Sequence, residues 1–135
     1  MTPLTDLERA CFGAAAWTHA QVTGALEAPG AVVVVEEGVG YVLGVRVLDE
    51  VELHRIGVLP TRRREGHGRR LYDRFVEAAT SAGARQLFLE VREDNHAARA
   101  LYASVGLETV GTRPRYYADG CAAVVMAGAV HGAPS

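Results

Sequence analysis

A cluster of arginines and glycines between residues 58 and 70 carries the residue types that bind an anion. Its sequence is VLPTRRREGHGRR, in which Gly66 and Gly68 are spaced by one residue and arginines lie on both sides. An apolar, strand-like run precedes the cluster, and a helix-like run follows it. A loop that opens a helix presents free backbone N–H groups and the positive end of the helix dipole, and guanidinium groups pair with phosphate oxygens. The cluster is therefore predicted to hold phosphates.

The glycine pair alone does not say which phosphates these are, since such a pair also occurs in plain turns before helices. A Walker loop would need Gly-Lys-Ser/Thr, and the cluster has no lysine. A dinucleotide fingerprint would need a third glycine where the bulky Leu71 stands. Both nucleotide motifs are excluded, while some of the arginines could simply form a solvated basic face.

What remains is Arg63-x-x-Gly66-x-Gly68, preceded by Val58-x-Pro60. This pattern resembles the acyl-CoA signature of the GCN5-related N-acetyltransferase (GNAT) superfamily, Gln/Arg-x-x-Gly-x-Gly/Ala. The glycines would let the backbone approach a pyrophosphate without a Cβ in the way. The resemblance implies acetyl-CoA as co-substrate and no metal. The cofactor-binding residues that it implies are Ile56, Gly57, Val58, Arg63, Arg64, Glu65, Gly66, His67, Gly68, Arg69, Asn95 and Tyr102.

A second motif follows in the run from Leu89 to Leu107, which contains LEVREDN and then Ala98-x-x-Leu101-Tyr102. It resembles the ribosomal-protein-alanine acetyltransferases, a branch of that superfamily that acetylates protein N-termini. The later segment RYYADG, residues 115–120, is similar to that branch too. The likeness covers about residues 8–127, and it implies Glu90 as general base and Tyr102 as general acid.

The spacing of these residues supports the assignment but leaves alternatives open. Asn95 and Tyr102 are seven apart, two helical turns, so they share a helix face and could meet a pantetheine arm and its thioester. Alternatively, Asn95 is only a helix N-cap and Tyr102 a core aromatic whose hydroxyl is satisfied. Glu90 lies in mid-strand, where a carboxylate needs a partner or a function. The alternative for Glu90 is a salt bridge at the rim with a nearby arginine.

The expected mechanism is direct attack of an amine on the thioester. An α-amino group has a pKa of about 8, so roughly a tenth is free base at neutral pH and a weak base suffices. A backbone N–H near Val58 would polarise the carbonyl. His54 and His67 are alternative bases that we rank below Glu90, and His67 is expected to pack or to touch phosphate.

The elements that position these residues follow from hydrophobic periodicity and capping signals. Thr18 and Gln21 form a predicted capping box. A strand–helix–strand segment should join two parallel strands, which predicts an α+β fold with a mixed sheet flanked by about four helices. Helices are expected over residues 4–12, 18–27, 68–82 and 95–105, and strands over 31–35, 41–47, 51–58, 85–92, 107–112 and 121–127.

Two departures from the family pattern concern the half of the fold that would face the acceptor. The chain starts almost at its first helix, so the first edge strand of the family is expected to be absent or truncated. Ala16-Trp17-Thr18 stands where the family has Pro-Trp-Ser/Thr. Acceptor contacts are expected from Tyr116, Tyr117 and the loops around Trp17 and Glu36.

Length and composition bound the remaining possibilities. The 135 residues predict one domain over 1–130 with a loose tail over 131–135. The net charge of −2 argues against a nucleic-acid binder, and no apolar run is long enough to span a membrane. Two distant cysteines and the lack of a signal sequence favour the cytoplasm.

The function expected is transfer of an acetyl group from acetyl-CoA to a protein N-terminus, with a ribosomal small-subunit protein that begins with alanine as the implied partner. The alternatives are acetylation of a lysine or a small amine, and a non-catalytic acyl-CoA-binding module. Binding of nucleic acid rests only on Arg62, Arg63 and Arg64 and is the weakest hypothesis. The sequence leaves the oligomeric state open.

Overall fold

The computed structural model describes residues 3–13 and 16–131, which form a six-stranded sheet with helices on both faces. The strand order is β1-β2-β3-β4-β6-β5. The helices are α1 (Leu4–Phe12), α2 (His19–Glu27), the short 3-10 helix η2 (Pro60–Arg62), α3 (His67–Ser81) and α4 (His96–Ser104). The strands are β1 (Ala31–Glu36), β2 (Gly40–Val47), β3 (Glu50–Val58), β4 (Gln86–Arg92), β5 (Glu108–Arg113) and β6 (Ala123–Ala129).

The sheet is mixed, as predicted. Strands β1, β2 and β3 form an antiparallel meander, and β6 pairs antiparallel with both β4 and β5. The crossover through α3 makes β3 and β4 parallel neighbours. Among the described residues α1 precedes every strand, so the described sheet begins at β1.

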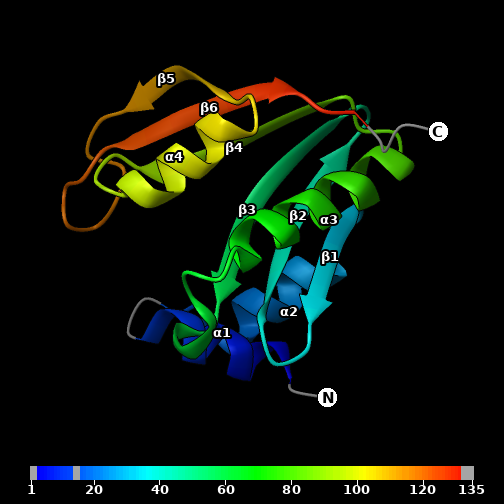
Figure 1. The fold of residues 1–135 in the computed structure, drawn as a ribbon, viewed down its shortest axis with the longest axis vertical. Helices are drawn as coiled ribbons and strands as arrows, with labels where there is room; N and C mark the ends of the chain where they lie inside the picture. The colour runs from blue at the N-terminus through cyan, green and yellow to red at the C-terminus, as the bar shows by residue number, and fades with distance from the viewer. Residues whose placement is uncertain (1–2, 14–15, 132–135) are drawn as a thin grey trace.

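The two halves of the sheet separate in the middle of the molecule (Figure 1). Strands β3 and β4 pair only from Glu50–Leu53 against Gln86–Leu89. Beyond that point β3 continues with β2 while β4 continues with β6. The separation begins where β3 carries a bulge, because Leu43 and Gly44 of β2 face Arg55 and Leu53 and leave His54 as the extra residue. A bulge bends its strand and increases the local twist, which turns β3 away from β4.

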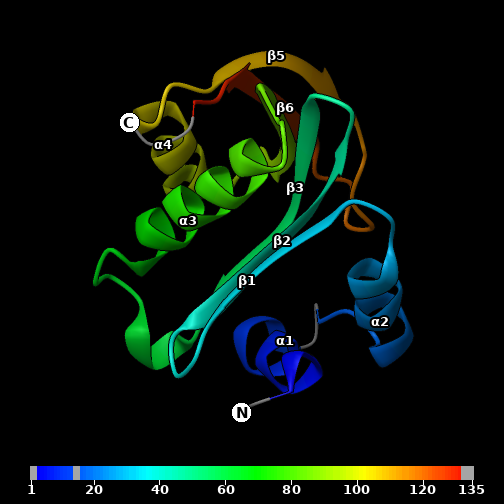
Figure 2. The same ribbon diagram turned by 90° about the vertical axis from the view of Figure 1, so that its right-hand side faces the viewer.

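Helices cover the two faces of the sheet unequally (Figure 2). Helices α3 and α4 lie on one face, where the larger hydrophobic core includes Leu71 and Phe75 of α3. Helices α1 and α2 lie on the other face, where Leu7 and Cys11 of α1 pack against Tyr41 in a smaller core. The site described below lies between these two layers at the separation of β3 and β4.

Most predicted element boundaries are confirmed to within one residue. Helix α1 has the predicted limits, and the capping box of α2 has both hydrogen bonds, Gln21 N–H to Thr18 Oγ1 and Thr18 N–H to Gln21 Oε1. Strands β1 to β5 also follow the expected ranges closely.

One prediction is wrong by two residues at each end. Strand β6 runs over Ala123–Ala129, whereas residues 121–127 were expected. The Cys121 N–H donates to Asp119 Oδ1, and its carbonyl accepts from Tyr117 N–H, which keeps Cys121 in the preceding turn. Of the predicted tail, only His131 lies inside the described residues. Within the described part, no helix has the length and apolar character to cross a membrane.

Candidate functional site

A cavity of about 630 Å³ fills the gap where β3 and β4 separate. Its volume lies in the range of small-molecule and cofactor sites. Its walls come from α1, the α1–α2 loop, β3, β4, α4 and the β5–β6 loop. The lining residues are Phe12, Trp17, Glu52, Leu53, His54, Arg55, Ile56, Leu89, Glu90, Val91, Arg92, Asn95, Ala98, Tyr102, Tyr116 and Tyr117. The predicted catalytic pair, Glu90 and Tyr102, therefore lines one cavity.

The carboxylate of Glu90 reaches the cavity from the middle of β4. Alternation along β4 buries Leu87, Leu89 and Val91 and turns Glu90 to the opposite face, where its side chain is 20% exposed. Its Oε2 atom is buried and accepts no hydrogen bond, although Arg113 Nε lies 3.3 Å away. The salt bridge considered as the alternative for Glu90 is thus present, but it leaves an acceptor atom unsatisfied.

The hydroxyl of Tyr102 has no hydrogen-bond partner among the described residues. Its residue is only 4% exposed, and its ring packs against Tyr72 with 6.1 Å between centroids. The hydroxyl oxygen is nevertheless not fully buried, and it reaches the cavity. Burial raises the pKa of Tyr102 well above its usual value, which keeps the hydroxyl protonated. The alternative, a core tyrosine whose hydroxyl is hydrogen-bonded within the protein, therefore does not describe Tyr102.

Asn95 is both the cap of α4 and a wall of the cavity. Its Oδ1 accepts a hydrogen bond of 3.1 Å from Ala98 N–H, the N-cap role considered as the alternative. Asn95 and Tyr102 do lie on one face of α4, as their spacing predicts, and both line the cavity. The cap holds the amide in place at the cavity wall.

The last three residues of β3 expose a strand edge to the gap. Beyond Leu53 the side of β3 that faces β4 pairs with no described strand. Ile56 lines the cavity, while Gly57 packs closely under α1, where a Cβ would lie 3.0 Å from Phe12 Cε2. The Val58 carbonyl accepts a hydrogen bond from Arg63 Nε. Backbone groups on this edge can bind an extended ligand arm.

The predicted phosphate loop has free amides at the start of α3. Gly66, with φ of 80°, is the N-cap in the left-handed region that favours glycine, and α3 begins at His67, one residue before the predicted start. The first helical hydrogen bond runs from Arg70 N–H to Gly66 C=O, so the N–H groups of His67, Gly68 and Arg69 find no acceptor in the described chain. A Cβ on Gly68 would meet only Leu101 Cδ2 at 3.8 Å, so the chain itself does not require a glycine there.

Most arginines of this loop already have partners within the protein. Arg63 donates to the carbonyls of Val58 and Cys11, at 3.1 and 2.8 Å, and so ties the loop to β3 and α1. Arg69 pairs with Asp73 at 3.1 Å. Further pairs join Arg62 to Glu65 and Arg70 to Glu36. Arg64 alone among these arginines has no side-chain partner in the described residues. It lies in the loop before α3 and has a φ of 66°, in the left-handed region.

His67 packs in the loop, as expected, and does not line the cavity that contains Glu90 and Tyr102. It is buried, its Nε2 lies 2.9 Å from Glu65 Oε1, and its Nδ1 lies 2.9 Å from Arg70 Nη2. The hydrogen bond with His67 holds the pKa of Glu65 below its usual value. These contacts stiffen the loop around its glycines.

A buried ion pair that the sequence did not predict lies behind the cavity wall formed by Phe12, Trp17 and Arg55. Glu8 of α1 is 1% exposed, and both of its oxygens are bonded by Arg55, at 3.2 Å from Nε and 2.7 Å from Nη2. The Tyr41 hydroxyl also donates to Glu8, as does the Trp17 N–H at 2.7 Å. The Arg55 guanidinium lies 3.7 Å from the ring centroid of Phe12. This cluster fixes the position of the wall that Phe12, Trp17 and Arg55 form.

The surroundings of Glu8 stabilise its charged form. Burial alone would raise the pKa of Glu8, but hydrogen bonds from Arg55, Tyr41 and the Trp17 N–H hold it below its usual value of 4.5. A signal for this residue was present in the sequence, because Leu4, Leu7, Glu8 and Cys11 follow the i, i+3, i+4, i+7 pattern of a buried helix stripe. A carboxylate on that stripe indicates a buried partner.

The β5–β6 loop supplies the remaining aromatic side chains. Arg92 pairs with Asp94 and with Asp119, which ties this loop to the end of β4. Tyr116 and Tyr117 line the cavity; their predicted role as acceptor contacts stays a prediction. The negative charge of Glu90 raises the pKa of Tyr116 above its usual value.

Two other predicted residues have different surroundings. His54, the alternative base, lines the cavity at the bulge and lies 3.4 Å from Glu52. Glu36 does not line the cavity; it pairs with Arg70 and with Arg74, so it belongs to the phosphate-loop side of the protein.

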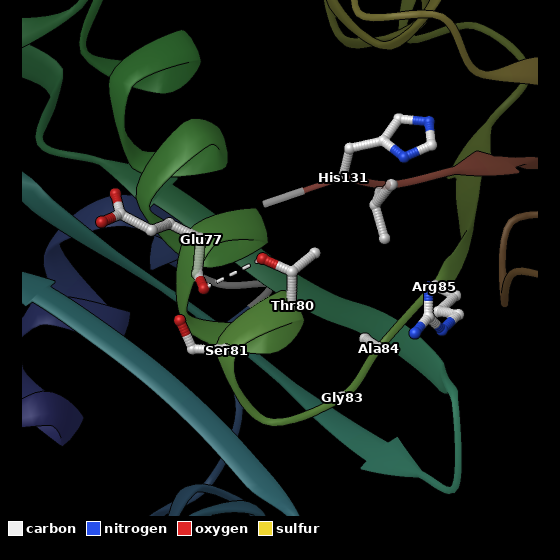
Figure 3. Close-up of a pocket in the computed structure, with 8 residues that line it drawn as sticks. Glu77, Thr80, Ser81, Gly83, Ala84, Arg85 and His131 are labelled. Atoms are coloured by element: carbon white, nitrogen blue, oxygen red, sulfur yellow. Dashed lines mark hydrogen bonds between the residues drawn. The ribbon is translucent and has the colours of Figure 1, made fainter. Parts of the chain in front are cut away.

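A second cavity, of about 400 Å³, lies at the far end of α3 (Figure 3). Glu77, Thr80 and Ser81 of α3 line it together with Arg85 and His131, and the Thr80 hydroxyl donates to the Glu77 carbonyl. It contains none of the predicted site residues. Within the described ranges, no group of three or more His, Cys, Asp or Glu side chains is arranged to hold a metal ion.

Comparison with known proteins gives a family match over residues 2–107, to the acetyltransferase (GNAT) family. N-alpha-acetyltransferase RimI of Mycobacterium tuberculosis is 48% identical over 68 residues, which are 50% of this chain and 41% of that protein. The ribosomal protein bS18-alanine N-acetyltransferase of Escherichia coli K12 is 42% identical over 71 residues, 53% of this chain and 48% of that protein. The chain spans less than half the length of these two curated relatives in the alignments.

A solved structure resembles nearly the whole chain. The crystal structure of the ribosomal-protein-alanine N-acetyltransferase from Escherichia coli has a TM-score of 0.83 with 29% sequence identity. The superposition covers 97% of this chain and 88% of that chain.

Proposed function

The chain belongs to the acetyltransferase (GNAT) family, and on that basis we propose that it transfers an acetyl group from acetyl-CoA to the α-amino group of a protein N-terminus. The observation that carries the proposal is that one cavity contains an incompletely bonded Glu90 carboxylate and a Tyr102 hydroxyl with no hydrogen-bond partner in the described part of the chain. The names of the relatives in Mycobacterium tuberculosis and Escherichia coli support the α-amino acceptor.

The acyl donor would lie between the loop and the catalytic pair. The free N–H groups of residues 67–69 would bind the pyrophosphate, and the absence of a Cβ on Gly68 leaves room for its close approach. Arg64 would contact a phosphate, because it is the arginine of this loop that has no side-chain partner among the described residues. The pantetheine arm would follow the open edge of β3 past Ile56 and reach Asn95.

Glu90 would act as the base. It accepts a proton from the acceptor ammonium, directly or through a water, and the free amine then attacks the thioester carbonyl. An N–H on the β3 edge near Val58 would stabilise the developing oxyanion. Because an α-amino group has a pKa of about 8, a weak base is sufficient to deprotonate it, whereas a lysine, with a pKa of about 10.4, would require a stronger base.

Tyr102 would act as the acid. As the tetrahedral intermediate collapses, the C–S bond breaks and the thiolate of CoA takes the hydroxyl proton. The raised pKa of Tyr102 supports this role, since the group keeps its proton until a strong acceptor forms beside it. The second proton of the attacking nitrogen and the proton on Glu90 then leave to solvent, and solvent reprotonates the phenolate through the cavity.

The acceptor would enter along the wall formed by Phe12, Trp17, Tyr116 and Tyr117. We propose a ribosomal small-subunit protein that begins with alanine as the partner, and the cytoplasm as the compartment. The proposed acceptor follows from the activity named for the Escherichia coli relative.

The test is a screen of acetyl transfer from acetyl-CoA to peptides that vary in their first two residues, with release of CoA as the readout. We expect transfer to free N-termini that begin with alanine. Matched peptides with a blocked N-terminus and an internal lysine, and a set of polyamines and aminoglycosides, serve as rival acceptors. Faster transfer to either rival set would contradict the N-terminal assignment, and no transfer to any amine would contradict the enzyme itself.

A further inference from the structure

We propose that Arg113 is a resident counter-ion of Glu90 that occupies the place of the acceptor's ammonium group and is displaced when the acceptor binds. This inference rests on the proposed function, and it adds a residue that tunes acceptor affinity. Arg113 ends β5, outside both sequence motifs, and it does not line the cavity itself.

The geometry at Glu90 Oε2 carries the inference. Arg113 Nε lies 3.3 Å from this atom, and Oε2 is sealed from solvent although it accepts no hydrogen bond. The rest of the Glu90 side chain remains 20% exposed and lines the cavity. The guanidinium therefore neutralises the carboxylate without satisfying its hydrogen-bonding capacity.

The surroundings of Arg113 allow it to leave. Its side chain is 60% exposed, and every residue of β5 is exposed, so neither packing nor a second side-chain ion pair in the described residues holds the guanidinium. Exposed ion pairs contribute little, so displacement changes an equilibrium by at most about fivefold. Arg55 on the opposite wall differs, because both oxygens of Glu8 and the Phe12 ring fix its guanidinium.

Exchange of one cation for another keeps the charge balance of the cavity. With Arg113 in place the carboxylate has a counter-ion when no acceptor is bound. When the ammonium donates to Oε2, it replaces that charge and supplies the missing hydrogen bond. The ammonium proton then passes to Glu90, the N–C bond forms, the nitrogen loses its second proton to solvent, the C–S bond breaks, and the thiolate takes the Tyr102 proton. An uncharged acceptor such as an alcohol could not make the exchange, so the site is selective for cationic amines.

The experiment compares wild type with Arg113→Met, Arg113→Lys and the control Arg115→Met, using the best peptide of the N-terminal screen. Arg115 lies two residues further on, is exposed, and has no side-chain partner among the described residues. We expect Arg113→Met to lower KM for the peptide by up to about fivefold while kcat stays within about twofold and KM for acetyl-CoA is unchanged. Arg113→Lys and Arg115→Met should stay near wild type.

A binding measurement without turnover separates affinity from chemistry. Calorimetric titration of the same peptide into each variant saturated with CoA should give the same order of affinities as KM. A higher peptide KM or a kcat reduced more than tenfold in Arg113→Met would overturn the inference, because Arg113 would then bind the acceptor or orient the base. An unchanged peptide KM would also overturn it. If wild type transfers no acetyl group to any amine, the proposed function fails instead, and the inference falls with it.

Discussion

Two carboxylates, Glu90 on one wall of the cavity and Glu8 buried behind the wall formed by Phe12, Trp17 and Arg55, each face an arginine but differ in their other contacts. Glu8 is 1% exposed and receives hydrogen bonds from Arg55, Tyr41 and a backbone N–H. Glu90 has one arginine nearby, no hydrogen bond to its buried oxygen, and an open path to the cavity. The comparison indicates that Glu8 is complete as a structural group, whereas Glu90 still has bonding capacity that a substrate can use.

The largest effect is expected from Glu90→Gln, which removes the proposed base but retains its shape. The loss of a general base should lower kcat by about 100- to 10,000-fold, while KM for acetyl-CoA stays the same. Steady-state kinetics with the best peptide measures both. Glu93→Gln is the matched control, because Glu93 is exposed and lies beyond the end of β4. A Glu90→Gln variant with near wild-type kcat would show that Glu90, like Glu8, does not act in the chemistry.

The opposite result is expected for Glu8→Gln, with a loss of stability larger than any direct loss of chemistry. Removal of one partner from a buried ion pair leaves Arg55 without its counter-charge, and we expect the free energy of unfolding to fall by about 3 kcal/mol. Urea denaturation followed by circular dichroism measures this change. Asp6→Asn on the same helix, at an exposed position, should change stability by no more than about 0.5 kcal/mol. Equal effects of the two substitutions would contradict the structural role of Glu8.

The lowered pKa of Glu8 predicts how stability depends on pH. Because its pKa in the folded chain lies below the usual 4.5, folding favours the charged carboxylate. Its contribution is complete above the unfolded pKa and is lost as pH falls through the folded one. Wild type should therefore lose more stability than Glu8→Gln when urea denaturation is repeated from pH 7 down to pH 3. Parallel curves for the two proteins would argue against the shift.

Two tyrosines extend the comparison at a smaller scale. Tyr102→Phe should reduce kcat by about 100-fold and leave stability nearly unchanged, because its hydroxyl bonds to no described residue. Tyr41→Phe should leave the chemistry intact and reduce stability by about 1.5–2 kcal/mol, because it removes a hydrogen bond to the charged Glu8. Kinetics and urea denaturation on both variants check the pair. If stability falls in Tyr102→Phe instead, its hydroxyl is a structural group.

The smallest effects are expected in the phosphate loop. Arg63→Ala removes hydrogen bonds to two backbone carbonyls and should reduce stability by about 1 kcal/mol. Arg64→Ala should leave stability unchanged and raise KM for acetyl-CoA by up to about fivefold, the range of an exposed ionic contact. Denaturation and acetyl-CoA titration on both variants measure the difference. If Arg63→Ala raises KM for acetyl-CoA more than Arg64→Ala does, our assignment of these two arginines is reversed.

The parts of this site that the sequence predicts are those that depend on local spacing. The glycines at 66 and 68 stand at a helix start, and Asn95 and Tyr102 share a helix face, because helix geometry fixes relations over a few residues. Alternation along β4 likewise placed Glu90 opposite the buried leucines. These predictions needed no knowledge of the tertiary structure.

The parts that could not be predicted depend on partners far apart in the chain. Arg55 meets Glu8 across 47 residues, and Arg63 meets the Cys11 carbonyl across 52. Either arginine could equally have faced solvent or a ligand as judged from its neighbours alone. Only the packing of α1 against β3 decides that Arg63 links the loop to the Cys11 carbonyl, whereas Arg64 has no side-chain partner among the described residues.

The bulge at His54 changes which residues of β3 face the core, from odd-numbered residues before the bulge to even-numbered residues after it. Before the bulge the odd-numbered residues Val51 and Leu53 face the core under α3, and after it the even-numbered Ile56 and Val58 do so. Arg55 is thereby turned toward Glu8 and away from the apolar core. Deletion of His54 would leave Leu53, Arg55 and Ile56 on their present faces, because it removes only the unmatched residue, but it would also remove the bend that turns β3 away from β4. Substitution of His54 would keep the bulge and its bend, so the gap that holds the cavity should survive another side chain at this position far better than the loss of the residue.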